Sequence, residues 1–147
     1  MSPDPRPGLA DLPRGHNFSP VSFRLSAADT ARYLEAVEDA NRAYFDDRES
    51  LAWAPPLAAA AFALKAVTDQ AHLPSGSLHA AQEVEFRCPI PVDADLTCRA
   101  AVAQRSEMRG MAVCVVEFEV SVAGQEGAAL VGRATVIAPL AQEKAGD

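Results

Sequence analysis

The fold of this chain is decided by residues 54–65, which read APPLAAAAFALK. Pro56 suits the first position of a helix, because proline has no N–H to leave unbonded there and its fixed φ is already helical. From Leu57 to Gln70 most residues are Ala, Leu, Val or Phe. A helix that is apolar nearly all round is predicted to be buried, and the turn residues Pro74 and Gly76 are predicted to follow its end.

Upstream of this helix, the sequence predicts a short strand, a second helix and a charged loop. Val21–Leu25 alternates apolar and polar residues, as a strand does. Ser26 is a good N-cap, and Asp29 three residues later suits the positive end of a helix. We expect this helix to run to about Asp39 and a loop to occupy residues 40–54. The expected inward face of the helix consists of Ala31, Leu34 and Val37.

Downstream, the sequence predicts four strands. They are Leu78–Arg87, Asp95–Gln104, Met111–Val122 and Ala128–Ile137. Each alternates or is rich in β-branched and aromatic residues, and glycines separate the later ones. Helices followed by a run of strands indicate an α+β fold with an antiparallel sheet. Because alanine side chains are small, a curved sheet can approach the buried helix closely, so we expect the sheet to wrap around it.

One domain is expected over residues 18–140, since 147 residues suffice for a single core. Residues 1–17 are rich in proline, glycine and charge, so they are predicted to form a flexible arm. Residues 141–147 are predicted to be a flexible tail.

Charge and cysteine usage limit the classes of partner. The formal net charge of -7 argues against nucleic acid and anionic membranes. The apolar run Leu57–Leu64 is too short to cross a bilayer, and no signal-peptide pattern is seen. Cys88, Cys98 and Cys114 lack a CxxC spacing and lie in apolar, strand-like sequence. We predict buried free thiols, which suit a reducing cytoplasm.

A second informative stretch is Asp39-Ala40-Asn41-Arg42-Ala43-Tyr44. It resembles the active-site loop of the MaoC-like hotdog family, which reads Asp-x-Asn-Pro-x-His. Asp39 and Asn41 match that loop. Arg42 replaces its proline, and Tyr44 replaces its histidine. The resemblance implies the hotdog fold, an antiparallel sheet around one long central helix, and the dehydration of (R)-3-hydroxyacyl thioesters or the reverse hydration.

Two further motifs resemble the N-terminal, fatty-synthase-type dehydratase domain of that family. Its members often carry the tyrosine, an Ala-Pro-Pro run before the central helix, here Ala54-Pro55-Pro56, and a histidine-led strand, here His79 through Pro89. The resemblance covers roughly residues 20–139. It implies the supporting half of a heterodimer, whose partner hotdog subunit carries the catalytic aspartate and histidine. The implied substrates are acyl thioesters of acyl carrier protein or coenzyme A, in fatty-acid or polyketide biosynthesis.

The chemistry of dehydration explains why the missing histidine matters. The reaction needs a base, an acid and donors to the thioester oxygen. Tyrosine, with a pKa near 10, is a poor general base at neutral pH, so Asp39 and Tyr44 form a degenerate catalytic pair. Helix capping is the alternative role for Asp39. The N–H groups of Leu57, Ala58 and Ala59 are candidate donors to the thioester oxygen, and a plain helix start is the alternative.

The expected substrate pocket consists of Asn41, Trp53, Pro55, Pro56 and His79. Asn41 is expected to bond the loop backbone, and Trp53 either lines the pocket or packs in the core. For His79, a half-buried structural role is the alternative to a role in the site. No metal or cofactor is expected, because the sequence has no zinc-ligand set and no glycine-rich phosphate loop.

Other functions stay open. One is a non-catalytic homodimer that binds an acyl thioester or another small apolar ligand. Another is a hotdog thioesterase, for which Asp69 is the only carboxylate on the central helix. Arg42, Arg48 and Arg87 are expected to face a phosphopantetheine phosphate or an acidic carrier protein, and exposure to solvent is the alternative. Pairing with a second chain is expected in every case, because a single hotdog leaves a sheet edge exposed.

Overall fold

The structure, a computed structural model, describes residues 4–141. The helices are α1 Ala27–Ala36 and α2 Pro56–Thr68, with short 3-10 helices η1 Leu9–Asp11 and η2 Arg42–Tyr44. The strands of the main sheet are β1 Val21–Phe23, β3 Leu78–Phe86, β5 Leu96–Met108, β6 Met111–Val122 and β7 Ala128–Pro139. A separate small sheet pairs β2 Trp53–Ala54 with β4 Ile90–Pro91.

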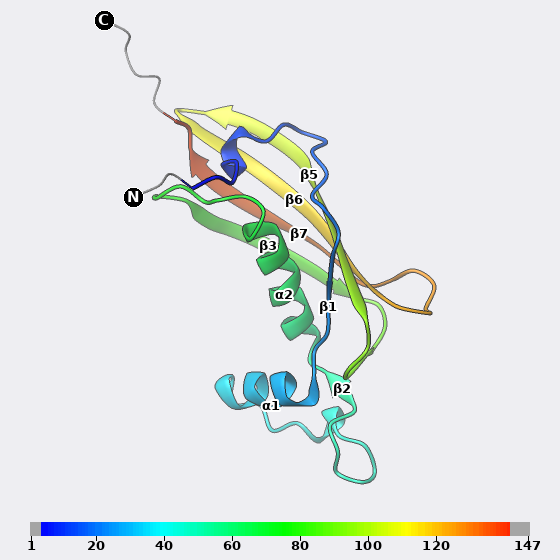
Figure 1. Cartoon of the computed structure of the whole chain (residues 1–147). Helices are drawn as coiled ribbons and strands as arrows, with labels where there is room; N and C mark the ends of the chain where they lie inside the picture. The colour runs from blue at the N-terminus through cyan, green and yellow to red at the C-terminus, as the bar shows by residue number, and fades with distance from the viewer. Residues whose placement is uncertain (1–3, 142–147) are drawn as a thin grey trace, which may run out of the picture.

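The main sheet is antiparallel throughout, in the order β1-β5-β6-β7-β3. Figure 1 shows α2 lying against one face of this sheet, with α1 and the loop that follows it beyond the first turn of α2. The predicted α+β fold, with a sheet around one long central helix, is confirmed. The four predicted strands correspond to β3, β5, β6 and β7.

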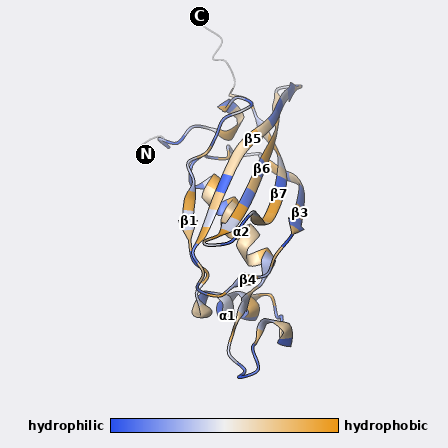
Figure 2. Cartoon of the chain, turned by 90° about the vertical axis from the view of Figure 1, so that its right-hand side faces the viewer, coloured by the Kyte–Doolittle hydropathy of each residue, from blue (hydrophilic) through white to orange (hydrophobic). Residues whose placement is uncertain are grey.

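Small side chains bring α2 close to the sheet. Pro56 is its first residue, as predicted, and Ala59 and Ala63 are completely buried. The carbonyl oxygen of Ala63 lies 3.8 Å from Sγ of Cys98 on β5. Figure 2 shows α2 in mostly hydrophobic colours, with hydrophilic positions on β5 and β6. The prediction of burial all round is wrong for one side of the helix, where Leu57 is 58% exposed.

A close contact between β6 and β7 tightens the core. Gly132 pairs with Phe118 across the two strands. A Cβ atom added at Gly132 would lie 2.3 Å from Cζ of Phe118. The phenyl ring therefore occupies the space that any other side chain at this position would need.

The first helix begins as predicted but ends earlier. Oγ of Ser26 accepts a hydrogen bond from the backbone N–H of Asp29 at 3.0 Å. The helix ends at Ala36, because Glu38 adopts a left-handed conformation with φ 56°. Leu34 is buried with Thr30, whereas Ala31 and Val37 are exposed, which corrects the predicted inward face.

The N-terminal segment corrects the prediction of a flexible arm for its described part, residues 4–17. Leu9, Ala10 and Leu12 are buried in the core. The N–H of Leu9 donates to the carbonyl of His72, and Arg105 donates to the carbonyl of Ala10 through Nε at 2.9 Å. Apolar burial and these hydrogen bonds outweigh the prolines and charges that favoured flexibility. The predicted tail, 141–147, lies outside the described residues from position 142 onward.

Within the described part of the chain, none of the helices has the length and apolar character needed to cross a bilayer.

Candidate functional site

The loop after α1 is held by its own side chains. Oδ1 of Asp39 accepts a hydrogen bond from the N–H of Asn41 at 3.0 Å. Oδ1 of Asn41 in turn accepts from the N–H of Ala43 and so caps η2 at 3.0 Å. The carbonyl of Tyr44 accepts from the N–H of Ala52 at 2.9 Å, which fixes the far end of the loop. Asn41 therefore bonds loop backbone, as expected, and Asp39 does so as well.

The degenerate catalytic pair is brought together. Oη of Tyr44 donates a hydrogen bond to Oδ2 of Asp39 at 3.0 Å. Partial burial, and then this hydrogen bond to a carboxylate, raise the pKa of Tyr44 above its ordinary value. The phenol consequently stays protonated at neutral pH and acts as a donor. At neutral pH, Tyr44 therefore has even less phenolate available to act as a base than a free tyrosine has. Both oxygens of Asp39 already accept hydrogen bonds.

The start of α2 offers fewer donors than predicted. The N–H groups of Ala58 and Ala59 both donate to the carbonyl of Pro55, at 3.0 Å and 3.4 Å. Proline at position 56 has no N–H. Within residues 4–141, no acceptor bonds the N–H of Leu57, whose side chain is exposed. Of the three predicted donors to a thioester oxygen, the geometry leaves Leu57 free.

A hollow of about 430 Å³ adjoins Tyr44 and the first turn of α2. Of the residues predicted to form a substrate pocket, Trp53 and Pro56 line this hollow. Pro55 is buried beside it, and Asn41 lies outside its lining. Its complete lining is Ala43, Tyr44, Trp53, Ala54, Pro56, Phe86, Arg87, Cys88, Pro89 and Ile90. The lining includes no histidine, so no imidazole is positioned to replace the missing one.

His79 lies elsewhere. It lines a second, narrower hollow of about 110 Å³ that also includes Leu64, Thr68 and Val136, between the last turns of α2 and the strands β3 and β7. His79 and Trp53, predicted to share the substrate pocket, therefore line different hollows. The walls of this second hollow are mainly apolar, and Leu9 of the N-terminal segment forms part of them.

Cys88 lines the hollow beside Tyr44, although the sequence predicted a buried thiol at this position. It is exposed, because β3 ends at Phe86 and the chain turns there toward β4. The flanking Pro89 was the available signal, since proline ends strand pairing. Cys98 and Cys114 are buried free thiols, as predicted, and burial raises the pKa of Cys98 to about 11.

The carboxylate required by the thioesterase alternative is engaged elsewhere. Asp69 accepts a hydrogen bond from Nζ of Lys65 at 2.7 Å, just beyond the last turn of α2. Both side chains are largely exposed, and neither lines the hollow beside Tyr44. Among residues 4–141, no three His, Cys, Asp or Glu side chains cluster as a metal site requires.

Several solved structures share this fold. An (R)-hydratase from A. caviae involved in PHA biosynthesis is 21% identical, with a TM-score of 0.71 over 89% of this chain and 98% of that chain. A MaoC-like dehydratase from Rhodospirillum rubrum is 16% identical, with a TM-score of 0.71 over 92% and 99%. The C-terminally truncated HadBC complex, a 3R-hydroxyacyl-ACP dehydratase from Mycobacterium tuberculosis, is 18% identical, with a TM-score of 0.72 over 88% and 99%. At these identities the likeness shows the fold, which is the predicted hotdog fold.

Among curated proteins, none matches this sequence. Residues 14–133 match the family described as "FAS1-like, dehydratase domain region". That match includes the Asp39–Tyr44 loop, all of α2 and most of the sheet. The chain therefore belongs to the FAS1-like dehydratase domain family, a MaoC-like hotdog family.

Proposed function

We propose that this chain is the supporting subunit of a two-chain dehydratase that acts on (R)-3-hydroxyacyl thioesters of carrier protein or coenzyme A in fatty-acid or polyketide biosynthesis. The observation that carries this proposal is the hydrogen bond between Tyr44 and Asp39. A phenol with a raised pKa and a carboxylate bonded on both oxygens are poorly suited to exchange protons with a substrate. The acid and base are then supplied by a partner that carries the intact Asp-x-Asn-Pro-x-His loop.

The apolar surface of this chain supports a protein partner. α2 packs chiefly against β5, β6 and β7, which leaves one side of the helix and the edge strand β3 uncovered. Leu57, Leu78 and Phe86 are 58%, 62% and 44% exposed along these two elements. An uncovered helix side and sheet edge that both carry exposed apolar side chains suit a protein partner. The HadBC structure, which shares this fold, is a complex of 3R-hydroxyacyl-ACP dehydratase subunits.

The two hollows suit an acyl thioester. The N–H of Leu57, at the positive end of α2, is our candidate donor to the thioester oxygen. The apolar hollow near Leu64 and Val136 suits the far part of an acyl chain, because burial of each CH₂ contributes about 0.8 kcal/mol. The N–H of Leu57 and this apolar hollow lie near opposite ends of α2.

The test is to assay dehydration by the purified chain alone and together with a hotdog protein that carries the intact loop. We expect background rates from the chain alone and a large increase in the mixture. Asp39→Ala and Tyr44→Phe in this chain should leave the rate of the mixture within a few-fold. Efficient dehydration by the isolated chain that is lost on Asp39→Ala would overturn the supporting role.

The second candidate function is a non-catalytic protein that binds an apolar ligand. The largely apolar walls of the hollow beside His79 favour it. It predicts binding of acyl-coenzyme A by the chain in the absence of a catalytic subunit, with no gain in dehydration when such a subunit is added.

A further inference from the structure

The narrow hollow of about 110 Å³ at the end of α2 has an exposed rim and a buried floor. Leu73 and Leu78 form the rim and are 44% and 62% exposed. The floor consists of lining residues that are each less than a tenth exposed, namely Leu9, Val67, Ala71, Val116 and Ala134. Leu9 is the largest side chain of the floor, so it does most to limit how deep an apolar chain can enter from the rim.

Leu9 comes from the N-terminal segment, which hydrogen bonds hold in place. The N–H of Leu9 donates to the carbonyl of His72, just after α2, at 3.0 Å. On the other side, Nε of Arg105 on β5 donates to the carbonyl of Ala10 at 2.9 Å. The floor is therefore fixed at this point. Leu9 also lies before residues 14–133, which match the family, so the matched part of the chain does not supply this side chain.

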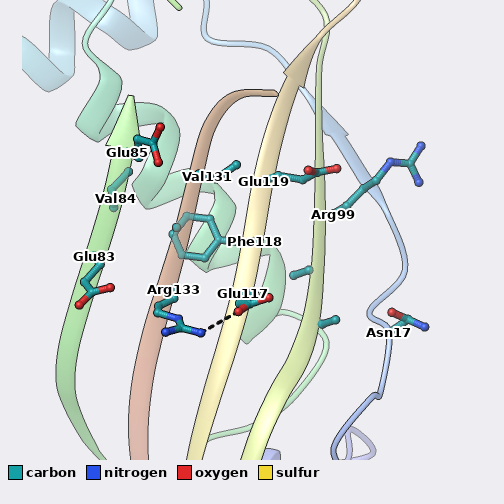
Figure 3. A pocket seen from close by; sticks show the side chains of 13 residues that line it. Asn17, Glu83, Val84, Glu85, Arg99, Glu117, Phe118, Glu119, Val131 and Arg133 are labelled. Atoms are coloured by element: carbon teal, nitrogen blue, oxygen red, sulfur yellow. Dashed lines mark hydrogen bonds and ion pairs between the residues drawn. The ribbon is translucent and has the colours of Figure 1, made fainter. Parts of the chain in front are cut away.

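The hollow on the other face of the sheet is unsuited to an alkyl chain. Figure 3 shows Glu83, Glu117 and Arg133 around this hollow of about 620 Å³. An alkyl chain placed there would take water away from charged groups, which costs free energy. The walls near Leu9 carry no charged side chain among their Leu, Val, Ala, Ser, Thr and His residues, apart from any protonated form of His79 at the exposed side.

The uncovered side of α2 leads to this hollow. Residues spaced four, three and four apart lie along one stripe of a helix, here Leu57, Ala61, Leu64 and Thr68. Leu57 and Ala61 are exposed, whereas Leu64 is the first of the four to line the hollow. Leu64 lies seven residues beyond Leu57, or about 10 Å along the helix. With C–C bonds of about 1.5 Å, an extended alkyl chain spans this distance with about eight carbons.

The volume of the hollow sets how many further carbons fit. A dry apolar cavity of about 150 Å³ accepts a benzene molecule. By that measure, a hollow of about 110 Å³ has room for roughly four carbons of an alkyl chain. Together with the carbons along α2, this gives an acyl chain of about twelve carbons.

We propose that Leu9 determines the acyl-chain length of this subunit, by stopping the end of a chain of about twelve carbons at the floor of the hollow. The inference deepens the proposed function, on which it rests for the acyl thioester and for its position at the N–H of Leu57. It assigns to the N-terminal segment the selection of substrates by length.

Straight-chain alcohols from propanol to octanol provide the test, because they imitate the end of an acyl chain without the thioester. Each is titrated into the isolated full chain, and affinity is measured by NMR from the amide signals of the floor residues. In the wild type, we expect each added carbon to raise the affinity about fourfold until the chain meets Leu9, and then no further gain. Leu9→Ala should move that limit to alcohols that are longer by about two or three carbons.

The matched control is Leu12→Ala, at a buried leucine of the same segment that does not line the hollow. It should keep the wild-type limit. A limit unchanged in Leu9→Ala would overturn the inference, and so would an equal shift in Leu12→Ala, because general loosening of the segment would then be the cause. Absence of alcohol binding at the floor of the wild type would overturn it as well.

Ala134→Val tests the floor without touching the N-terminal segment, in case Leu9→Ala does not fold. It adds two methyl groups to the floor, so the limit should move to alcohols that are shorter by about one carbon. An unchanged limit in this variant would overturn the inference. The readout is binding to the isolated chain, so a failed dehydration assay in the presence of a catalytic subunit would count against the proposed function alone.

Discussion

The phenol of Tyr44 and the carboxylate of Asp39, five residues apart in the chain, meet at 3.0 Å across the turn that follows α1. The turn is also closed by backbone bonds to the side chains of Asp39 and Asn41. Where a catalytic loop of this pattern has an imidazole, this one has a group that holds its proton and bonds the neighbouring carboxylate. The loop is thereby stabilised at the expense of acid–base capacity.

The Tyr44→Phe variant should show this stabilising role and its pH dependence. It removes one part-buried hydrogen bond, so we expect a loss of about 0.5–1.5 kcal/mol in the free energy of unfolding near neutral pH. The folded state raises the pKa of Tyr44. Its contribution is therefore fully present below about pH 10 and is lost as the pH rises through the raised pKa. Urea unfolding of the wild type and of Tyr44→Phe, from neutral to alkaline pH, checks this prediction. A stability difference between the two proteins that grows at alkaline pH would contradict it.

Thiol accessibility gives a second prediction. Cys88 is exposed, whereas Cys98 and Cys114 are 2% and 0% exposed. Burial also holds the pKa of Cys98 at about 11, so that thiol stays protonated near neutral pH. Titration of the native protein with a chromogenic disulfide should detect one fast thiol, and denaturant should reveal three. Cys88→Ser should abolish the fast phase, and persistence of that phase would contradict the placement of this residue.

Local signals in the sequence were enough to predict much of the fold. The start of α2 follows from Pro56, and the cap of α1 follows from Ser26, because both depend on neighbours in the chain. The strands β6 and β7 follow from their runs of β-branched residues. These features need no knowledge of distant contacts.

The errors arise where distant contacts decide. Leu9 is buried because hydrogen bonds to His72 and Arg105 hold the segment around it. Neither residue is near Leu9 in sequence. Leu57 is exposed because no element within residues 4–141 covers that side of α2. His79 and Trp53 were expected in one pocket, but they line hollows near opposite ends of α2.

The N-terminal segment should therefore contribute measurably to stability. Leu9 is 2% exposed and packs in the core. Leu9→Ala removes buried methyl groups and leaves a cavity, so we expect a loss of about 2–5 kcal/mol in the free energy of unfolding. The matched control is Leu57→Ala, at an exposed leucine, which should change stability by less than about 0.5 kcal/mol. Equal effects of the two substitutions in urea unfolding would show that the segment is not part of the core.

The contact between Gly132 and Phe118 gives a prediction about overpacking. Gly132→Ala would place a methyl group against the phenyl ring, so we expect a loss of about 1–3 kcal/mol. The double variant G132A/F118L should be less destabilised than the sum of its single variants, because leucine is smaller than the ring. Additive effects in thermal or urea unfolding would rule out the steric explanation.

The backbone of the Asp39–Tyr44 loop suits the proline and the histidine that Arg42 and Tyr44 replace. Asn41 is extended, with φ −64° and ψ 125°, which suits a residue before proline. Arg42 is the first residue of η2, a position at which proline is tolerated. R42P/Y44H should therefore fold and place an imidazole, which titrates near pH 6.5, beside Asp39. Because general acid–base catalysis contributes about 10²–10⁴-fold, we expect the hydration of an enoyl-coenzyme A by the isolated chain to rise at least about tenfold above background. The control R42P/Y44F keeps the loop but lacks the imidazole, and it should stay at background. Equal rates for the two variants would mean that the missing histidine is not what limits this chain.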